Sequence, residues 1–200
     1  MKRIVFVLEQ FFGGGAERVT NALVNEICKL PGYEVHVLTY RMDSEKEYPT
    51  DNRVIRHNMN QKEDKRNRFL RIVDRVVFLR EKISQIRPWC VVSLAIPKTV
   101  CLLVLAMTGM RIPLILSERN DPVQFPVGKL ARGLRLWAYL HANGLVFQTE
   151  EAKNFFPNSI KRKGIVICNP LTGCMPERYV GERKKQIVNF CERFECAAGS

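Results

Sequence analysis

The first forty residues contain, in order, a short apolar run, a segment in which apolar residues recur with helical spacing, and a second apolar run. Ile4–Leu8 holds five consecutive apolar residues, some of them β-branched, which predicts a buried strand. In residues 16–30 the apolar positions recur every three or four residues, as in an amphipathic helix. Pro31 and Gly32 end that helix, and the alternation in Glu34–Thr39 predicts a second strand.

The same alternation continues along the rest of the chain. Further strands are expected at Arg53–His57, Cys90–Leu94, Pro113–Ser117, Leu145–Phe147 and Gly164–Cys168. Further helices are expected at residues 62–87, at Thr99–Met110, at Gly128–His141 and after Thr149, whose hydroxyl suits an N-cap. Strands that alternate with helices predict an α/β domain with a mostly parallel sheet. Such sheets bind ligands beyond the carboxyl ends of their strands, so the candidate loops are 9–15, 94–98, 118–126 and 148–150.

Length and charge narrow the class of protein. A chain of 200 residues has room for one domain and a short additional segment. It is too short for an enzyme built from two domains of about 150 residues or more each. The 46% hydrophobic content excludes a disordered chain. A net charge of +12 predicts an anionic partner such as a phosphate, a lipid headgroup or a nucleic acid. We expect no nucleic-acid partner, because the sequence shows no zinc knuckle, RNA-binding aromatic motif or basic zipper.

Cysteine usage and the apolar segments predict the compartment. The seven cysteines include no C-x-x-C pair, and the apolar run after Arg3 is too short for a signal peptide. We therefore expect reduced, mostly buried cysteines in a cytoplasmic protein. The apolar stretch Thr99–Met110 is shorter than the ~20 residues that span a bilayer, so a buried helix is expected there.

Three glycines lie between the first strand and the first helix. Gly13, Gly14 and Gly15 allow another molecule to approach the backbone, and a helix start offers free N–H groups to an anion. This pattern predicts a diphosphate-binding turn, although a plain tight turn fits the same residues. The P-loop motif is absent, and the dinucleotide motif G-x-G-x-x-G fails at Arg18. Arg41 follows the second strand, where an arginine holds an NADP phosphate, so an NADP-dependent oxidoreductase stays an alternative.

Three more motifs follow in order along the chain. The first is the polar cluster Ser117-Glu118-Arg119-Asn120-Asp121-Pro122, which suits hydroxyls and phosphate, although a solvated loop with an internal salt bridge is equally compatible. The others are Phe-Gln-Thr-x-x-Ala-Lys at residues 147–153 and Ile-Cys-Asn-Pro at residues 167–170. With the strand–Gly-Gly-Gly-Ala-Glu-Arg–helix unit, this set resembles the N-terminal domain of family 4 glycosyltransferases, which are retaining enzymes of GT-B architecture.

The resemblance covers residues 1–172 and implies a Rossmann-like three-layer domain, the N-terminal, acceptor-side half of a GT-B architecture. It implies that the loop facing the donor's diphosphate and the helix start behind it consist of Gly13, Gly14, Gly15, Glu17 and Arg18. It implies that the acceptor cleft is lined by Glu118, Arg119 and Asn120. The implied reaction moves a sugar from a nucleotide-diphosphate sugar to an acceptor hydroxyl in glycan, polysaccharide or glycolipid synthesis, with no cofactor and no metal. Many relatives have a histidine in the stretch corresponding to residues 117–121, and this chain has none there, so no catalytic residue is assigned.

The last 28 residues depart from the family pattern. Residues 173–200 would be a linker and the start of the nucleotide-sugar-binding domain, and residues 186–191 resemble its first strand. The motifs that follow in the family are missing, so we expect a truncated or frameshifted chain without transferase activity of its own. A non-catalytic module that binds an acceptor glycan or a lipid is the alternative.

Two basic segments are candidates for a membrane contact. Residues 62–87 carry nine basic and four acidic side chains, and residues 129–137 combine three basic residues with Leu130, Leu134 and Trp137. In the simpler interpretation both apolar stripes pack on the sheet and the charges are solvated. The expected stripe of the first segment is Phe69, Ile72, Val73, Val76, Val77, Ile83 and Ile86. In the alternative both segments contact anionic lipid at the inner face of the membrane, which suits the lipid-linked acceptors of many members of the resembled family.

Overall fold

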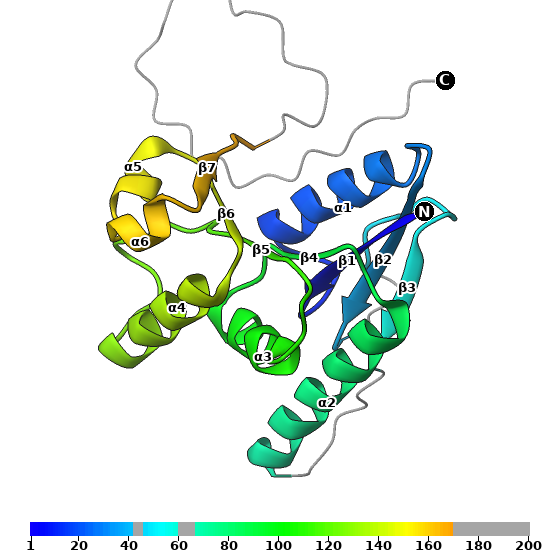
Figure 1. Ribbon diagram of the computed structural model, residues 1–200, viewed down its shortest axis with the longest axis horizontal. Coiled ribbons are helices and arrows are strands. Elements are labelled where there is room, and N and C mark those ends of the chain that lie inside the picture. Colours follow the sequence, from blue (N-terminus) through cyan, green and yellow to red (C-terminus); the bar gives the residue numbers. More distant parts are fainter. Residues whose placement is uncertain (42–45, 60–66, 170–200) are drawn as a thin grey trace, which may run out of the picture. The chain divides into compact units, whose positions relative to one another are not determined.

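The computed structural model describes residues 1–41, 46–59 and 67–169, and Met1–Pro170 form one compact unit. The described residues build a parallel sheet of seven strands in the order β3-β2-β1-β4-β5-β6-β7 (Figure 1). The strands are β1 (Lys2–Leu8), β2 (Tyr33–Thr39), β3 (Ile55–Asn58), β4 (Cys90–Ser93), β5 (Leu114–Ser117), β6 (Gly144–Phe147) and β7 (Gly164–Val166). The strand order reverses between β1 and β4, and ligands of such sheets bind at this switch point.

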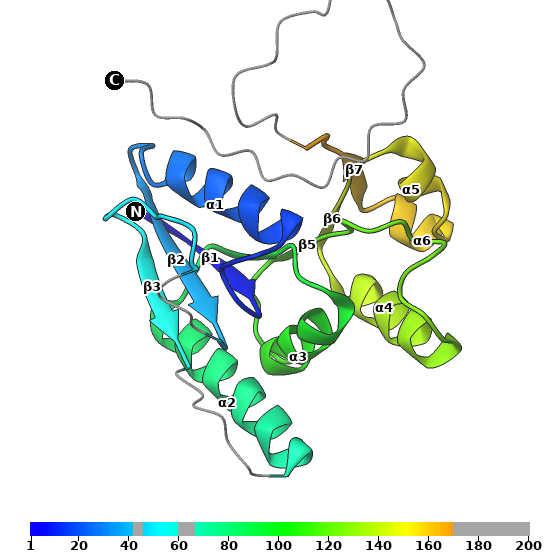
Figure 2. The same ribbon diagram turned by 180° about the vertical axis from the view of Figure 1, so that it is seen from behind.

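Helices cover both faces of the sheet. They are α1 (Gly15–Ile27), α2 (Arg68–Ile86), α3 (Pro97–Met107), α4 (Lys129–His141), α5 (Glu150–Asn154) and α6 (Asn158–Lys161). Both views place α1 on the opposite side of the strands from α2 and α3 (Figures 1 and 2). Alternate residues of β1 supply the two cores: Val5 and Val7 pack with α2, α3 and α4, whereas Phe6 and Leu8 pack with α1. Because β1 is buried on both faces, its sequence is a continuous apolar run.

The predicted α/β domain with a parallel sheet is confirmed, and its fold is Rossmann-like. The expected buried helix at Thr99–Met110 is α3, most of whose side chains are buried. In the part of the chain that the structure describes, no helix is long and apolar enough to cross a membrane. The sequence did not predict α6, a single turn between α5 and β7.

The predicted packing of α2 is partly wrong. Ile83 and Ile86 are buried as expected, but Phe69, Val73 and Val77 are exposed. The neighbouring Val76 packs against the core and Leu79 is fully buried. Phe69, Val73 and Val77, which are spaced four residues apart, therefore lie on a different face of α2 from the one that packs on the core. Residues 60–66 of the predicted helix lie outside the described residues.

Some basic side chains of α2 are not the solvated face that the sequence predicted. Arg80 donates from Nη1 to the carbonyl oxygens of Ala106 and Thr108, at 2.9 Å each, and so satisfies the carboxyl end of α3. The guanidinium of Arg75 lies 5.0 Å from the centre of the Tyr40 ring and 4.0 Å from the Glu9 carboxylate. These contacts tie α2 to its neighbours.

Four cysteines lie in the described residues, and all are free thiols. Cys28, Cys90 and Cys101 are buried, whereas Cys168 is exposed. Burial raises the pKa of the Cys90 and Cys101 thiols, which makes them poor nucleophiles. The predicted segment 173–200, with its strand at 186–191, lies outside the described residues.

Candidate functional site

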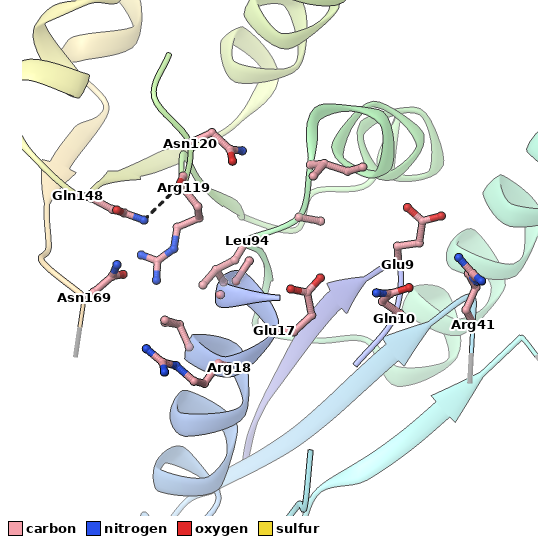
Figure 3. A pocket seen from close by; sticks show the side chains of 15 residues that line it. Glu9, Gln10, Glu17, Arg18, Arg41, Leu94, Arg119, Asn120, Gln148 and Asn169 are labelled. Atoms are coloured by element: carbon pink, nitrogen blue, oxygen red, sulfur yellow. Dashed lines mark hydrogen bonds between the residues drawn. The ribbon is translucent and has the colours of Figure 1, made fainter. Parts of the chain in front are cut away.

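A cavity of about 500 Å³ lies at the carboxyl ends of the strands, at the switch point between β1 and β4. Its walls come from the segments that follow β1, β2, β4, β5, β6 and β7 and from the first turn of α1 (Figure 3). The lining residues are Glu9, Gln10, Gly15, Ala16, Glu17, Arg18, Val19, Arg41, Leu94, Ala95, Ile96, Arg119, Asn120, Gln148 and Asn169. We call this the switch-point cavity.

The glycine turn forms one edge of the switch-point cavity. Gly13 has φ 83°, a left-handed conformation that favours glycine. Gly14 is the N-cap of α1, with no side chain to cap the helix. Gln10 Nε2 donates to the carbonyl of Phe12 at 3.1 Å, and Tyr48 donates from its hydroxyl to the carbonyl of Gly14 at 3.4 Å. The turn is therefore held in place and presents the start of α1 to the cavity.

Glu17, in the first turn of α1, lies near the middle of the lining of the switch-point cavity. In Figure 3 its carboxylate stands between Arg119 on one side and Glu9, Gln10 and Arg41 on the other. Burial raises the pKa of Glu17, and the nearby Glu9 carboxylate raises it further, against a backbone hydrogen bond that lowers it. The site therefore mixes acidic groups with the guanidinium groups of Arg18, Arg41 and Arg119.

Glu118, predicted to line the acceptor cleft, forms a buried ion pair beneath the loop that follows β5. Its side chain is only 3% exposed, and its Oε2 accepts from Arg135 Nη1 at 3.2 Å and from the Tyr139 hydroxyl at 3.0 Å. The same guanidinium donates to the carbonyls of Phe125 at 2.6 Å and Pro122 at 3.2 Å. Burial raises the pKa of Glu118 although Arg135 opposes that shift.

This ion pair supports the backbone of Arg119 and Asn120. Glu118 Oε1 accepts from the backbone N–H of Asn120 at 3.2 Å, while Gln148 Nε2 donates to the carbonyl of Arg119 at 3.3 Å. The Arg119 side chain then enters the switch-point cavity near Gln148 and Asn169 (Figure 3). Its Nη2 nitrogen is buried and has no hydrogen-bond partner in the structure, and burial lowers the pKa of Arg119. A desolvated guanidinium with free donors is suited to binding an oxyanion.

A second cavity, of about 510 Å³, shares the wall made by Arg119, Asn120 and Gln148. We call it the loop cavity. Its other lining residues are Glu118, Asp121, Pro122, Val123, Thr149, Glu151, Ala152 and Phe155. Arg119 is the one basic residue in this lining, which otherwise combines apolar, uncharged polar and acidic side chains. The two cavities therefore differ in charge while they share one wall.

The structure brings together most of the residues that the sequence singled out. Gly15, Glu17, Arg18, Arg119 and Asn120 all line the switch-point cavity. Gly13 and Gly14 lie in the turn just before it, and Glu118 lies beneath the shared wall. The roles predicted for these residues stay predictions.

Sequence reasoning missed Gln10, Arg135 and the contact between two of the three histidines. Gln10 follows a strand end, which is a signal that the sequence contains. Arg135 was one of the basic residues of the candidate membrane contact at 129–137, but its side chain is 1% exposed. His36 Nδ1 lies 3.0 Å from His57 Nε2 across β2 and β3. No group of three or more metal-ligating side chains occurs in residues 1–41, 46–59 and 67–169.

Comparison with known proteins identifies the fold class. The chain is similar to a UDP-GlcNAc 2-epimerase from Neisseria meningitidis bound to UDP-GlcNAc, with 17% identity over 82% of this chain and 45% of that one, at a TM-score of 0.57. It is also similar to HepE from Anabaena in complex with UDP, with 15% identity over 86% and 44% of the two chains, at a TM-score of 0.61. A third similar structure is the lipopolysaccharide outer core galactosyltransferase WaaB, with 15% identity over 84% and 46%, at a TM-score of 0.60.

These similarities define the fold as the N-terminal Rossmann-like half of a GT-B architecture, the architecture of glycosyltransferases and sugar-nucleotide epimerases. The chain spans less than half the length of the solved structures that it matches. No family model matches the chain, and no curated protein matches it.

Proposed function

We propose that this domain is the acceptor-side half of a family 4-like glycosyltransferase, which moves a sugar from a nucleotide-diphosphate sugar to an acceptor hydroxyl. The carrying observation is the wall formed by Arg119, Asn120 and Gln148. It separates a cavity lined by three arginines and two glutamates from a cavity lined by one arginine and three acidic residues. In this proposal the switch-point cavity receives the donor's diphosphate and the loop cavity receives the acceptor. Both substrates would then meet at Arg119.

The chemistry of each lining supports this division. Arg18, Arg41 and Arg119 offer positive charge to a diphosphate, and the start of α1 adds free backbone N–H groups. In the loop cavity, the ring of Phe155 and the side chain of Val123 are 43% and 58% exposed, which provides an apolar surface for a sugar ring or a lipid. Carboxylates on its rim accept hydrogen bonds from acceptor hydroxyls.

The described residues support catalysis by position and charge. The buried Glu118–Arg135 pair fixes the backbone that carries Arg119 and Asn120, so these groups are arranged before substrate binds. Arg119 would stabilise the negative charge that develops on the departing diphosphate, and a pre-oriented charge of this kind needs no rearrangement in the transition state. In this proposal the nucleotide and the sugar are held by the second half of the GT-B architecture, so the domain described here is not expected to transfer sugar by itself.

The proposal is tested by amide NMR titrations of the isotope-labelled chain with UDP-GlcNAc and, separately, with NADPH. We expect UDP-GlcNAc to shift the signals of Gly15, Arg119 and Gln148. Arg119→Gln should weaken that binding by about 10-fold or more, since a hydrogen bond to a charged group contributes roughly 1.5–3 kcal/mol. Arg111→Gln is the matched control, because Arg111 precedes β5 and does not line the switch-point cavity.

Two outcomes would favour the alternatives. Tighter binding of NADPH than of UDP-GlcNAc, with shifts centred on Arg41, would replace the proposal by an oxidoreductase. A glycan that shifts only residues of the loop cavity, with no response to any sugar nucleotide, would indicate a non-catalytic acceptor-binding module.

The rim of the loop cavity also supports the proposal that the acceptor is lipid-linked and is met at an anionic membrane surface. Val127 and Leu130 are 82% and 79% exposed, and Val123 borders the cavity itself. Lys129 lies between the two most exposed of these side chains in the sequence. Arg132 donates to the carbonyl of Val123 at 2.9 Å, which keeps the apolar side chains of loop and helix in one area. The exposed Phe69, Val73 and Val77 make α2 a second contact area in this proposal.

A further inference from the structure

Glu17 covers the start of α1 with its own side chain. It is the third residue of the helix, and its carboxylate folds back over Gly14, where an added Cβ would overlap Oε2 and lie 2.9 Å from Cδ. The interaction of this carboxylate with the backbone N–H of Glu17 favours its charged form and acts to lower its pKa, against the effect of burial. A negatively charged group of the chain therefore holds the position to which a helix start attracts an anion.

The groups around this carboxylate are those of the switch-point cavity. Arg18 comes from α1 itself, Glu9 from the segment after β1, Arg41 from the segment after β2 and Arg119 from the loop after β5. The Glu9 carboxylate is 4.0 Å from Arg75 of α2. Glu17 thus stands among guanidinium groups that would also attract a phosphate.

We infer that Glu17 is an internal competitor for the ligand's phosphate: its carboxylate holds the start of α1 and must move away or take up a proton when a phosphate binds there. The inference rests on the proposed function, and it predicts that the affinity for a diphosphate depends on pH. It also assigns Glu17 a regulatory role that is distinct from direct contact with the ligand.

The direction of the pH effect follows from electrostatics. Burial and the Glu9 carboxylate already raise the pKa of Glu17, so a proton is bound there more easily than at an exposed glutamate. A bound phosphate adds negative charge beside Glu17 and raises that pKa further. Binding therefore takes up a proton, and the affinity for an anion rises as the pH falls towards the pKa of Glu17.

The first test measures binding of inorganic pyrophosphate by titration calorimetry to the 200-residue chain and to two variants. Glu17→Gln should bind pyrophosphate about fivefold to thirtyfold more tightly, because a partly buried charge at a helix start contributes about 1–2 kcal/mol. Glu26→Gln is the matched control: it removes the same charge from the same helix, but Glu26 lies near the other end and its side chain is 72% exposed. Thermal melts of both variants show that the fold is retained.

The second test uses sulfate, which does not titrate near neutral pH, in two buffers with different ionisation enthalpies. The natural chain and Glu26→Gln should take up part of a proton on binding sulfate, whereas Glu17→Gln should take up almost none. A role of Glu17 in helix stability alone would not change this proton count. Equal proton uptake by all three chains would overturn the inference.

The outcomes separate this inference from the proposed function. If Glu17→Gln binds pyrophosphate no more tightly than Glu26→Gln, Glu17 is not a competitor, and the function proposed for Arg119 still stands. If Arg119→Gln binds pyrophosphate as the natural chain does, the proposed role of Arg119 fails, while the comparison of the two glutamate variants still decides the inference. If none of these chains binds pyrophosphate at millimolar concentration, both are wrong.

Discussion

Replacing Arg135 by methionine should strongly destabilise the domain, and the loss of stability should depend on pH. Arg135 and Glu118 are 1% and 3% exposed, and their charged atoms are 3.2 Å apart. Methionine fills a similar space but has no charge and no donor. Glu118 would then keep its Tyr139 and backbone hydrogen bonds, without the positive charge that balances its carboxylate.

The structure gives the size of the effect. Removing one partner of a buried ion pair costs about 3–5 kcal/mol, because the remaining charge is buried without compensation. The carbonyls of Phe125 and Pro122 also lose the donors that Arg135 provides, which adds roughly 1 kcal/mol for each hydrogen bond. Protonation of Glu118 limits the total loss of stability, because a neutral carboxyl group is tolerated in an apolar site. We therefore expect about 3–5 kcal/mol at neutral pH, a large part of the total stability of a typical domain.

The sign of the pH dependence follows from the same burial. The pKa of Glu118 is already raised in the folded chain, and loss of Arg135 raises it further. A group whose folded pKa is raised stabilises the fold below its unfolded pKa and loses that contribution as the pH rises through the folded pKa. Arg135→Met should therefore be less destabilised at about pH 5 than at about pH 8.

Urea denaturation followed by circular dichroism at both pH values measures these effects. The double variant Glu118→Gln with Arg135→Met separates charge from shape, because it removes both charges and should recover part of the lost stability. A destabilisation below about 1 kcal/mol at pH 8, or a double variant as unstable as Arg135→Met, would refute the reasoning. If Arg135→Met does not fold, Arg135→Lys gives the milder test, since it keeps the charge but loses the forked geometry.

Three further predictions concern other parts of the domain. Gly164→Ala should destabilise the fold by about 1–3 kcal/mol in thermal melts, because its Cβ would overlap a buried aromatic ring on β6, whereas the Cβ of Gly144→Ala makes ordinary contacts. Leu130→Ser should reduce flotation of the chain with anionic vesicles. The control Leu30→Ser makes the same substitution at an exposed site outside the proposed contact area, and it should not reduce flotation. Burial lowers the pKa of His57, so the unfolded chain binds that proton more readily and stability should fall between about pH 7 and about pH 5; His57→Gln should flatten this profile.

The fold was largely predictable because its sheet is buried on both faces. A strand with helices on either side favours apolar residues at every position, and β1 has this pattern over five consecutive buried residues. The five buried residues of β2 depart from it at His36 and Thr39. The site loops were predictable for a related reason. All parallel strands end at the same edge of the sheet, so the polar segments that follow β1, β5 and β6 had to meet there.

The packing of long helices was less predictable. The apolar positions of α2 spread over more than one face of the helix, and periodicity alone does not show which of these faces meets the core. Phe69, Val73 and Val77 therefore looked like core positions, although they are exposed. The core side is the one that carries Val76, Leu79 and Ile83.

The charge of the chain shows a similar limit. A net charge of +12 predicted an anionic partner, yet Arg80 and Arg135 donate to carbonyl oxygens, and Arg56 pairs with Glu47 at 2.7 Å. These arginines hold the fold together, so they add to the count without offering charge to a ligand. Arg119 differs because its side chain lines both cavities, and its buried Nη2 has no hydrogen-bond partner in the structure that would compete with a ligand there. In the proposed function, the strength of the anion site would therefore depend on the guanidinium groups that line the switch-point cavity, those of Arg18, Arg41 and Arg119, and not on the total charge.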